Sequence, residues 1–195
     1  MAVYALNGSA ELGRYRTVTV FPDVKPSHWA AAYINMAAKG KNIISGFADG
    51  RFHPDRTVTL GQAVTILLRM LGYKDEDVGG VWPDSYMAEA AIIGLTDGVG
   101  TDGSAGLTRG QAARLFLNLL RAPTKEGGST FAGTVGQTVE GVLLASDSEG
   151  GEGHLRLSNG ITYNLAEGRA SNGMLNGLKG TLVVDGGGQS NRTMD

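Results

Sequence analysis

Apolar residues recur at spacings of three and four through the first two thirds of the chain. Such spacing places them on one face of a helix, so it predicts helices over residues 26–40, 59–72 and 108–121, with turn-rich loops between them. Gly40, Gly72 and Pro123 mark their ends. The expected apolar faces are Trp29, Tyr33 and Ala37, then Ala63, Ile66, Leu67, Met70 and Leu71, then Ala112, Leu115, Phe116, Leu119 and Leu120.

Beyond Pro123 the spacing changes to short stretches in which apolar and polar residues alternate, as in half-buried strands. Asn159-Gly160 stands between two of these stretches and predicts a type I′ hairpin. The four expected strands cover residues 138–146, 154–158, 161–166 and 181–185. The pattern therefore predicts an α+β multidomain chain, with helical helix-loop-helix repeats followed by a small all-β module that is barrel-like or sandwich-like.

The helical part contains an internal repeat. Pro22-Asp23 recurs 61 residues later, whereas Thr59-x-Gly-Gln-Ala recurs only 49 residues later, at Thr108. The second copy is therefore shorter in its middle. The expected divisions are an N-terminal segment or remnant of a preceding repeat over 1–20, a repeat over 21–74, a degenerate repeat over 75–122, a linker over 123–130 and the β module over 131–195.

Both copies begin a helix with Thr-x-x-Gln, as Thr59 with Gln62 and as Thr108 with Gln111. In such a capping box, threonine and glutamine satisfy each other's free backbone N–H groups, so these residues have a structural explanation that needs no ligand. Capping does not explain Arg109, because a cation at the start of a helix costs roughly 0.3–1 kcal/mol. A solvated surface arginine, a salt bridge to a nearby aspartate or a ligand contact would each explain it.

Composition narrows the classes of function. The chain has 195 residues, 31 glycines and no cysteine, which excludes disulfides, thiolate metal sites and a cysteine nucleophile. Its three histidines lack metal-ligand spacing, and no serine-nucleophile motif occurs. We therefore expect no catalytic residues, no metal site and no cofactor. No apolar run is long enough to predict membrane insertion, and residues 1–16 lack the layout of a signal peptide.

Charge is unevenly distributed, although the net charge is only −2. Residues 21–74 carry seven lysines and arginines against three acidic residues, whereas the stretches 75–126 and 127–195 are acidic. A basic segment inside an acidic chain favours an anionic partner there, and ordinary surface scatter is the other explanation. The excess is too small to predict nucleic-acid binding.

Four sequence blocks stand in order in the first copy: Phe-Pro-Asp-Val from residue 21, His-Trp-Ala from 28, Gly-Phe-x-Asp-Gly-x-Phe from 46 and Pro-Asp from 54. With these blocks the copy resembles the S-layer homology repeat. The second copy keeps only Trp82-Pro83-Asp84, Asp97-Gly98 and the box at Thr108. The resemblance covers about 20–121, which is over half of the chain.

This resemblance implies a non-catalytic anchor. Such repeats usually come in threes, form a three-pronged spindle, and hold an anionic, often pyruvylated, secondary cell-wall polysaccharide in the grooves between the prongs. The family's signature matches Thr108, Arg109 and, with glutamine in place of glutamate, Gln111; Leu60 replaces the arginine in the first copy. The other residues at family positions near the groove are Trp29, Gly46, Asp49 and Gly50. Without a ligand, Trp29 would be a core residue and Asp49-Gly50 a turn.

Two main hypotheses of function follow. The first is an extracellular anchor in the cell wall or surface layer, whose partner is the cell-wall polysaccharide. The alternative is a structural subunit of a surface layer or filament in which the repeats act as packing units. Leu60 and the shortened second copy favour this hypothesis. Self-association, or completion of the spindle to a trimer, fits two repeats and a fragment. A fragment of a wall hydrolase is a third, weaker hypothesis.

Overall fold

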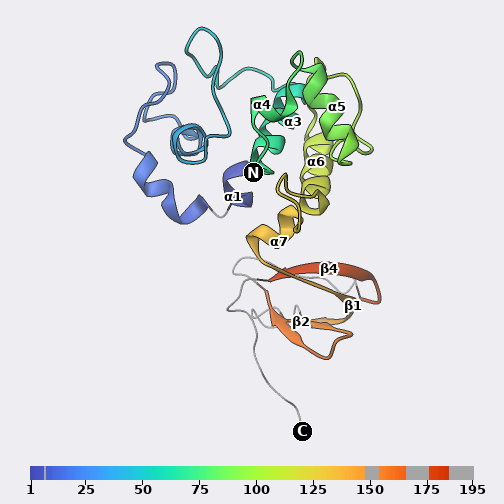
Figure 1. The fold of residues 1–195 in the computed structure, drawn as a ribbon. Helices are drawn as coiled ribbons and strands as arrows, with labels where there is room; N and C mark the ends of the chain where they lie inside the picture. The colour runs from blue at the N-terminus through green and yellow to red at the C-terminus, as the bar shows by residue number, and fades with distance from the viewer. Residues whose placement is uncertain (7, 148–153, 166–175, 185–195) are drawn as a thin grey trace. The chain divides into compact units, whose positions relative to one another are not determined.

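The computed structural model describes residues 1–6, 8–147, 154–165 and 176–184 (Figure 1). The chain divides into two compact units, Met1–Phe131 and Ala132–Asp195. The first unit is helical and the second contains an antiparallel sheet, so the predicted α+β class is confirmed. The finer divisions between repeats stay predictions.

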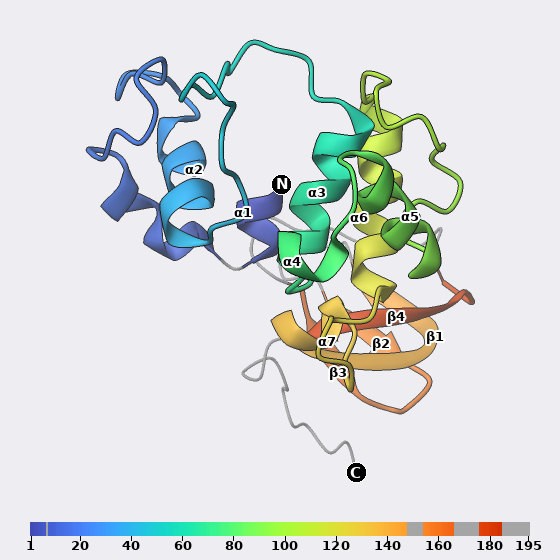
Figure 2. The ribbon, with the colours of Figure 1, turned by 45° about the horizontal axis from the view of Figure 1, so that its top comes forward.

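The helical unit is built from short elements around one longer pair of helices. The 11-residue α3 contacts α1, α5 and α6, and Figure 2 shows α3, α5 and α6 side by side. The bounds in this unit are α1 Ala2–Ala5, the 3-10 helix η1 Gly8–Tyr15, α2 Ala31–Asn35, the π-helix η2 Met36–Gly40, α3 Leu60–Met70, α4 Asp75–Val78, α5 Asp84–Ile92 and α6 Arg109–Arg121; α7, Phe131–Val135, begins at its last residue.

The first predicted helix begins later than expected. Turns precede it, because the N–H groups of His28 and Ala31 bond to carbonyls three residues earlier. α2 therefore starts at Ala31, and its buried face is Ala31, Ile34 and Asn35. Trp29 lies before the helix, is 83% exposed and stacks against His28 with ring centroids 5.9 Å apart. The expectation of Trp29 as a core residue is wrong.

The Asn35 side chain is bonded to the segment that precedes the first repeat. This side chain is fully buried, and its amide donates to the carbonyls of Tyr15 and Val18 at 3.2 and 2.5 Å. Its carbonyl oxygen accepts the N–H of Val20 at 3.3 Å. A buried amide bonded on both sides is a stable polar contact in an apolar surrounding, so residues 15–20 are part of the helical unit.

The buried face of α3 also differs from the predicted one. Leu67, Met70 and Leu71 are buried as expected, but Ala63 and Ile66 are only partly buried. Leu60, Val64 and Leu68 are buried in addition. The difference arises because α3 is covered by several neighbours, and a helix enclosed on more than one side buries more than a single stripe. In α6, which is less enclosed, Leu115 and Leu119 are buried as expected and Leu120 is 38% exposed.

Residues 123–130, predicted as a linker, are joined to the helical unit by several bonds. The N–H of Lys125 donates to the carbonyl of Leu71 at 2.9 Å, and its ammonium group pairs with Asp77. The N–H of Thr124 donates to the carbonyl of Ser129 at 3.0 Å, which closes the loop on itself.

The second unit contains one four-stranded sheet with the order β3-β2-β1-β4. Its strands are β1 Gln137–Asp147, β2 His154–Leu157, β3 Thr162–Asn164 and β4 Lys179–Val184. The first half of β1 pairs with β4 and its second half with β2, with a register shift between Leu143 and Ala145. Such a bulge bends the strand and increases its local twist. Within the described residues this sheet is open, so the expected barrel-like or sandwich-like closure is not found there.

The hairpin at Asn159-Gly160 is confirmed, but its turn type is not the predicted one. The N–H of Leu157 donates to the carbonyl of Ile161 at 3.1 Å, which leaves a loop of three residues. Gly160 has a φ of +80°, whereas Asn159 is not in the positive-φ region that a type I′ turn requires. The turn is therefore type I followed by a glycine bulge.

No helix in the part of the chain that the structure describes has the length and apolar character to cross a bilayer.

Candidate functional site

A cavity of about 620 Å³ opens on the helical unit. Its walls come from the segment between η2 and α3, from α3 itself, and from the start of the second repeat. Apolar walls are supplied by Ile43, Ile44, Pro54, Val58 and Ile66. The lining side chains with charge or an aromatic ring are Phe47, Phe52, His53, Arg56, Arg69, Asp75, Trp82 and Tyr86.

Asp23 holds one wall of this cavity in place. Its carboxylate accepts the backbone N–H groups of Phe52 and His53 at 3.0 and 2.7 Å. Partial desolvation acts to raise the pKa of Asp23, but these two donors outweigh it and keep the pKa below its usual value. The contact fixes His53 with a φ of +55°, a conformation rare outside glycine.

The turn before this wall is tightened by Gly46 and Asp49. Gly46 has a φ of +73°, and a Cβ there would lie 2.4 Å from the ring of Phe21, so only glycine fits. The Asp49 carboxylate accepts the N–H of Arg51 at 3.0 Å and meets His53 Nε2 at 2.8 Å. The Arg51 N–H is the main cause that keeps the pKa of Asp49 below its usual value, and His53 adds to it.

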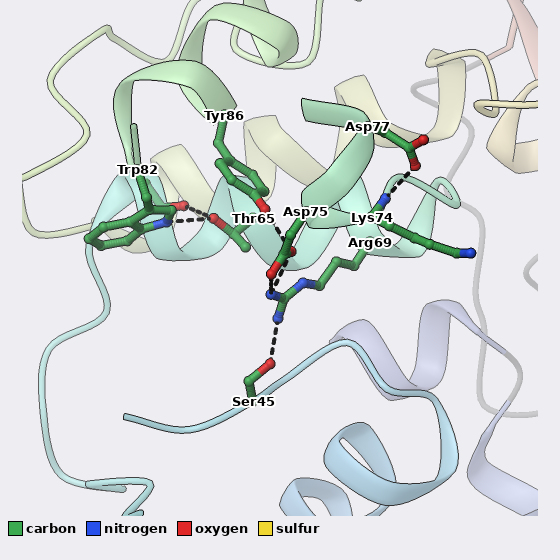
Figure 3. Close-up of polar contacts among 9 residues, drawn as sticks. Ser45, Thr65, Arg69, Lys74, Asp75, Asp77, Trp82 and Tyr86 are labelled. Carbon is green, nitrogen blue, oxygen red and sulfur yellow. Dashed lines mark hydrogen bonds and ion pairs between the residues drawn. The ribbon is translucent and has the colours of Figure 1, made fainter. Parts of the chain in front are cut away.

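Two arginines of the cavity differ in how they are paired. Arg69 donates to Ser45 at 3.0 Å and to the Asp75 carboxylate at 2.9 and 3.2 Å, so its charge is compensated (Figure 3). The guanidinium carbon of Arg56 instead lies 5.0 Å from the centre of the Phe47 ring. Arg56 forms no ion pair with any carboxylate among the described residues, so its charge is available at the cavity.

The opposite wall is held by hydrogen bonds between α3 and the second repeat. The Trp82 indole N–H donates to the Thr65 hydroxyl at 3.0 Å, and the Tyr86 hydroxyl donates to Asp75 at 2.6 Å (Figure 3). This Tyr86 bond, followed by the Arg69 bonds, keeps the pKa of Asp75 below its usual value. Trp82 remains 50% exposed, so its ring has both an anchored N–H edge and an accessible apolar face.

The seven residues that the sequence singled out fall at three separate places. Gly46 lines the cavity, and Asp49 and Gly50 lie on the exposed turn beside it. Trp29 is exposed and does not line the cavity. The remaining three, Thr108, Arg109 and Gln111, lie together at the N-terminus of α6 and do not line it either.

The sequence pattern did not indicate Arg56 and Trp82 as residues of the cavity. Arg56 lies in the basic segment 21–74, which was the one signal for an anionic partner, and Trp82 stands at the start of the second copy of the repeat. Both signals were present in the sequence, but neither indicates that the two residues face the same cavity. Within the described ranges, no three His, Asp or Glu side chains lie close enough to hold a metal ion.

The starts of α3 and α6 show why one repeat carries leucine where the other carries arginine. At α3 the N–H groups of Leu60 and Gly61 donate to the carbonyls of Ala105 and Gly103, both at 2.9 Å. Leu60 is only 2% exposed. The loop of the second repeat therefore covers the start of α3, and an arginine there would be buried beside groups that are already bonded.

At α6 the same position is open. Both threonine capping boxes are present, and in the second one the Gln111 side chain also donates to the carbonyl of Val99 at 3.0 Å. Arg109 is exposed and forms no hydrogen bond or ion pair with a described residue. A salt bridge to a nearby aspartate does not explain this arginine.

Residues 20–64 match the model of the S-layer homology domain. The chain contains an S-layer homology domain. The resemblance inferred from the sequence is thus confirmed for the first repeat, which includes Asp23, Gly46, His53 and Arg56. The second repeat lies outside the match and stays a prediction.

Related proteins share this domain in different contexts. The chain is 35% identical over 121 residues to the middle cell wall protein of Brevibacillus brevis (62% of this chain, 11% of that protein) and 35% identical over 94 residues to the surface layer protein of Brevibacillus choshinensis (48% and 8%). It is 32% identical over 72 residues to endo-1,4-beta-xylanase A of Thermoanaerobacterium saccharolyticum (37% and 6%). The matched stretches thus span only 6–11% of the length of these relatives. No solved structure matches it.

Proposed function

We propose that the helical unit is a non-catalytic anchor at the bacterial cell surface, which binds an anionic polysaccharide of the cell wall in the cavity of the S-layer homology domain. The observation that carries the proposal is the unpaired Arg56 guanidinium at a cavity that also presents the half-exposed ring of Trp82. Arg56 would bind a carboxylate of the polymer, and Trp82 would contact the apolar face of a sugar ring.

The chemistry of Arg56 suits this role. Its guanidinium lies over the Phe47 ring, and such a contact orients the planar group without using its N–H donors. Those donors can bind a carboxylate in a bidentate manner, and hydrogen bonds between charged groups are about twice as strong as neutral ones. The basic excess of residues 21–74 adds a field that attracts an anionic polymer.

The relatives support the anchoring part of the proposal. Two of them are named as a cell wall protein and a surface layer protein, and another as a xylanase, yet each shares only a small part of its length with this chain. A module found in proteins with such different names supplies something other than one particular catalytic activity. Attachment to the cell surface is the role that fits all three names.

The N-terminus of α6 is a second place for an anion contact in this proposal. Arg109 is exposed, and a Cβ added at the next residue, Gly110, would meet nothing within 4 Å. The first N–H groups of a helix favour anions, and the guanidinium would add to them. Thr108 and Gln111 would act there chiefly by forming the cap, because each side chain already accepts the other residue's backbone N–H and the Thr108 hydroxyl donates to the Gln111 side chain.

Co-sedimentation with purified Gram-positive cell-wall sacculi, before and after acid extraction of the secondary polymers, tests the proposal. The variants are Arg56→Gln, Arg109→Gln and the control Arg51→Gln. The control removes an exposed cation of the same segment, because Arg51 does not line the cavity. We expect wild-type binding to disappear with extraction. In Arg56→Gln it should fall by at least about tenfold, since a charged hydrogen bond is worth about 1.5–3 kcal/mol and each 1.4 kcal/mol is a factor of about ten. Arg51→Gln should bind like wild type.

Other outcomes separate the alternatives. If only Arg109→Gln lost binding, the contact would lie at α6 rather than in the cavity. If wild type failed to bind unextracted walls, the anchor hypothesis would be rejected for this chain. The alternative, a packing subunit of a surface layer or filament, then predicts concentration-dependent self-association in analytical ultracentrifugation.

A further inference from the structure

We infer that His53 makes anion binding in the cavity stronger in mildly acidic conditions, an inference that rests on the proposed function. His53 lines the same cavity as Arg56 and is held there from two sides. Asp23 fixes its backbone, and Asp49 bonds its ring. The ring position is therefore set by the fold, and its protonation changes the cavity without moving the chain.

The Asp49 contact determines the state of each ring nitrogen. An ionised carboxylate can only accept hydrogen bonds, so in neutral His53 the proton must be on Nε2, which lies 2.8 Å from Asp49 Oδ2. Nδ1 is then a bare acceptor, which repels an anion. It forms no hydrogen bond with another described residue. Protonation converts Nδ1 into a donor and adds a positive charge to the ring.

The charged groups around the cavity leave room for the protonation of His53 to affect anion binding. Arg69 is compensated by Asp75 and contributes little net charge. Arg56 lines the same cavity and forms no ion pair with a carboxylate of the described residues. An anion bound by Arg56 would therefore have a second cation in the same cavity once His53 is protonated. The ionisable groups that face the cavity or the ring are Asp23 before α2, Asp49 and Arg56 on the segment of His53, Arg69 on α3, Asp75 on α4 and Tyr86 on α5. Arg51 lies beside Asp49 and does not line the cavity.

Histidine is the side chain whose charge ordinarily changes between pH 5 and 8, so binding isotherms at pH 5.5 and 7.5 test the inference. The probe is sacculi that carry their secondary polymers, at constant ionic strength. Wild type should bind about two- to fivefold more tightly at pH 5.5, the range expected for one additional partly exposed charge pair. His53→Gln should lose this pH ratio. His154→Gln, which removes an imidazole from the sheet unit, should keep it.

An unchanged pH ratio in His53→Gln would overturn the inference while leaving the proposed function intact. Absence of wild-type binding at both pH values would overturn both together. A measurement on the wild type covers the case in which the variant misfolds. Acid-extracted wall polymer is added, and the pH titration of the His53 ring protons is followed by NMR. The titration should move to higher pH, because proton binding and polymer binding strengthen each other reciprocally. No movement on addition of a polymer that binds would also overturn the inference.

Discussion

Leu60→Arg restores the arginine of the S-layer homology signature to the first repeat, and we expect it to destabilise the protein instead of creating a second anion contact. Leu60 is 2% exposed, and its N–H is bonded to the loop of the second repeat. Removing a buried leucine costs about 2–5 kcal/mol, and an unpaired cation at such a site costs several more unless it escapes to solvent. Partial escape of the long side chain gives an expected loss of about 4 kcal/mol.

Urea unfolding of the full chain, followed by far-ultraviolet circular dichroism, measures this loss. For a unit of this size, 4 kcal/mol corresponds to a fall in Tm of the order of 15 °C. The matched control is Arg109→Leu, the reverse exchange at the equivalent position of α6. Because Arg109 is exposed at a helix start, its removal should change the free energy of unfolding by no more than about 1 kcal/mol, towards greater stability.

A free energy of unfolding of Leu60→Arg within about 0.5 kcal/mol of wild type would refute the predicted burial, since the side chain could not then be enclosed as the structure has it. Tighter wall binding by a stable Leu60→Arg would refute it more strongly, because the start of α3 would then be accessible to ligand.

Three further predictions concern the frame of the site. Gly46→Ala should destabilise by about 2 kcal/mol more than Gly50→Ala, because both have positive φ but only the first added Cβ meets another ring and a carbonyl; thermal unfolding of the pair measures the difference. Asn35→Ala should cost about 1–3 kcal/mol by leaving three backbone groups unpaired. A change near zero in urea unfolding would contradict the role of these three bonds. Tyr86→Phe should be less stable than wild type above about pH 4, the ordinary range of Asp75. Because the folded pKa of Asp75 is lowered, this gap should shrink as the pH falls through that lowered value, and urea unfolding at pH 6 and pH 2.5 tests it.

The sequence by itself determined the features that depend on neighbours within a few residues. The capping boxes at Thr59 and Thr108, the hairpin at Asn159 and the separation of a helical region from a strand-rich one were all predictable. Each rests on contacts between residues at most four or five apart along the chain, so residue type and spacing suffice to specify it. The blocks that identify the S-layer homology domain are read in the same way.

Only the tertiary structure decided which of these residues meet. Leu60 and Arg109 occupy equivalent positions in sequence, yet one is enclosed by a loop more than forty residues away and the other is open. Trp29 looked like a core residue, but the late start of α2 leaves it in solvent, while Arg56 and Trp82 line a common cavity. Long-range packing sets these outcomes, because burial and pairing depend on the surfaces that other segments bring, and a local pattern contains no information about them.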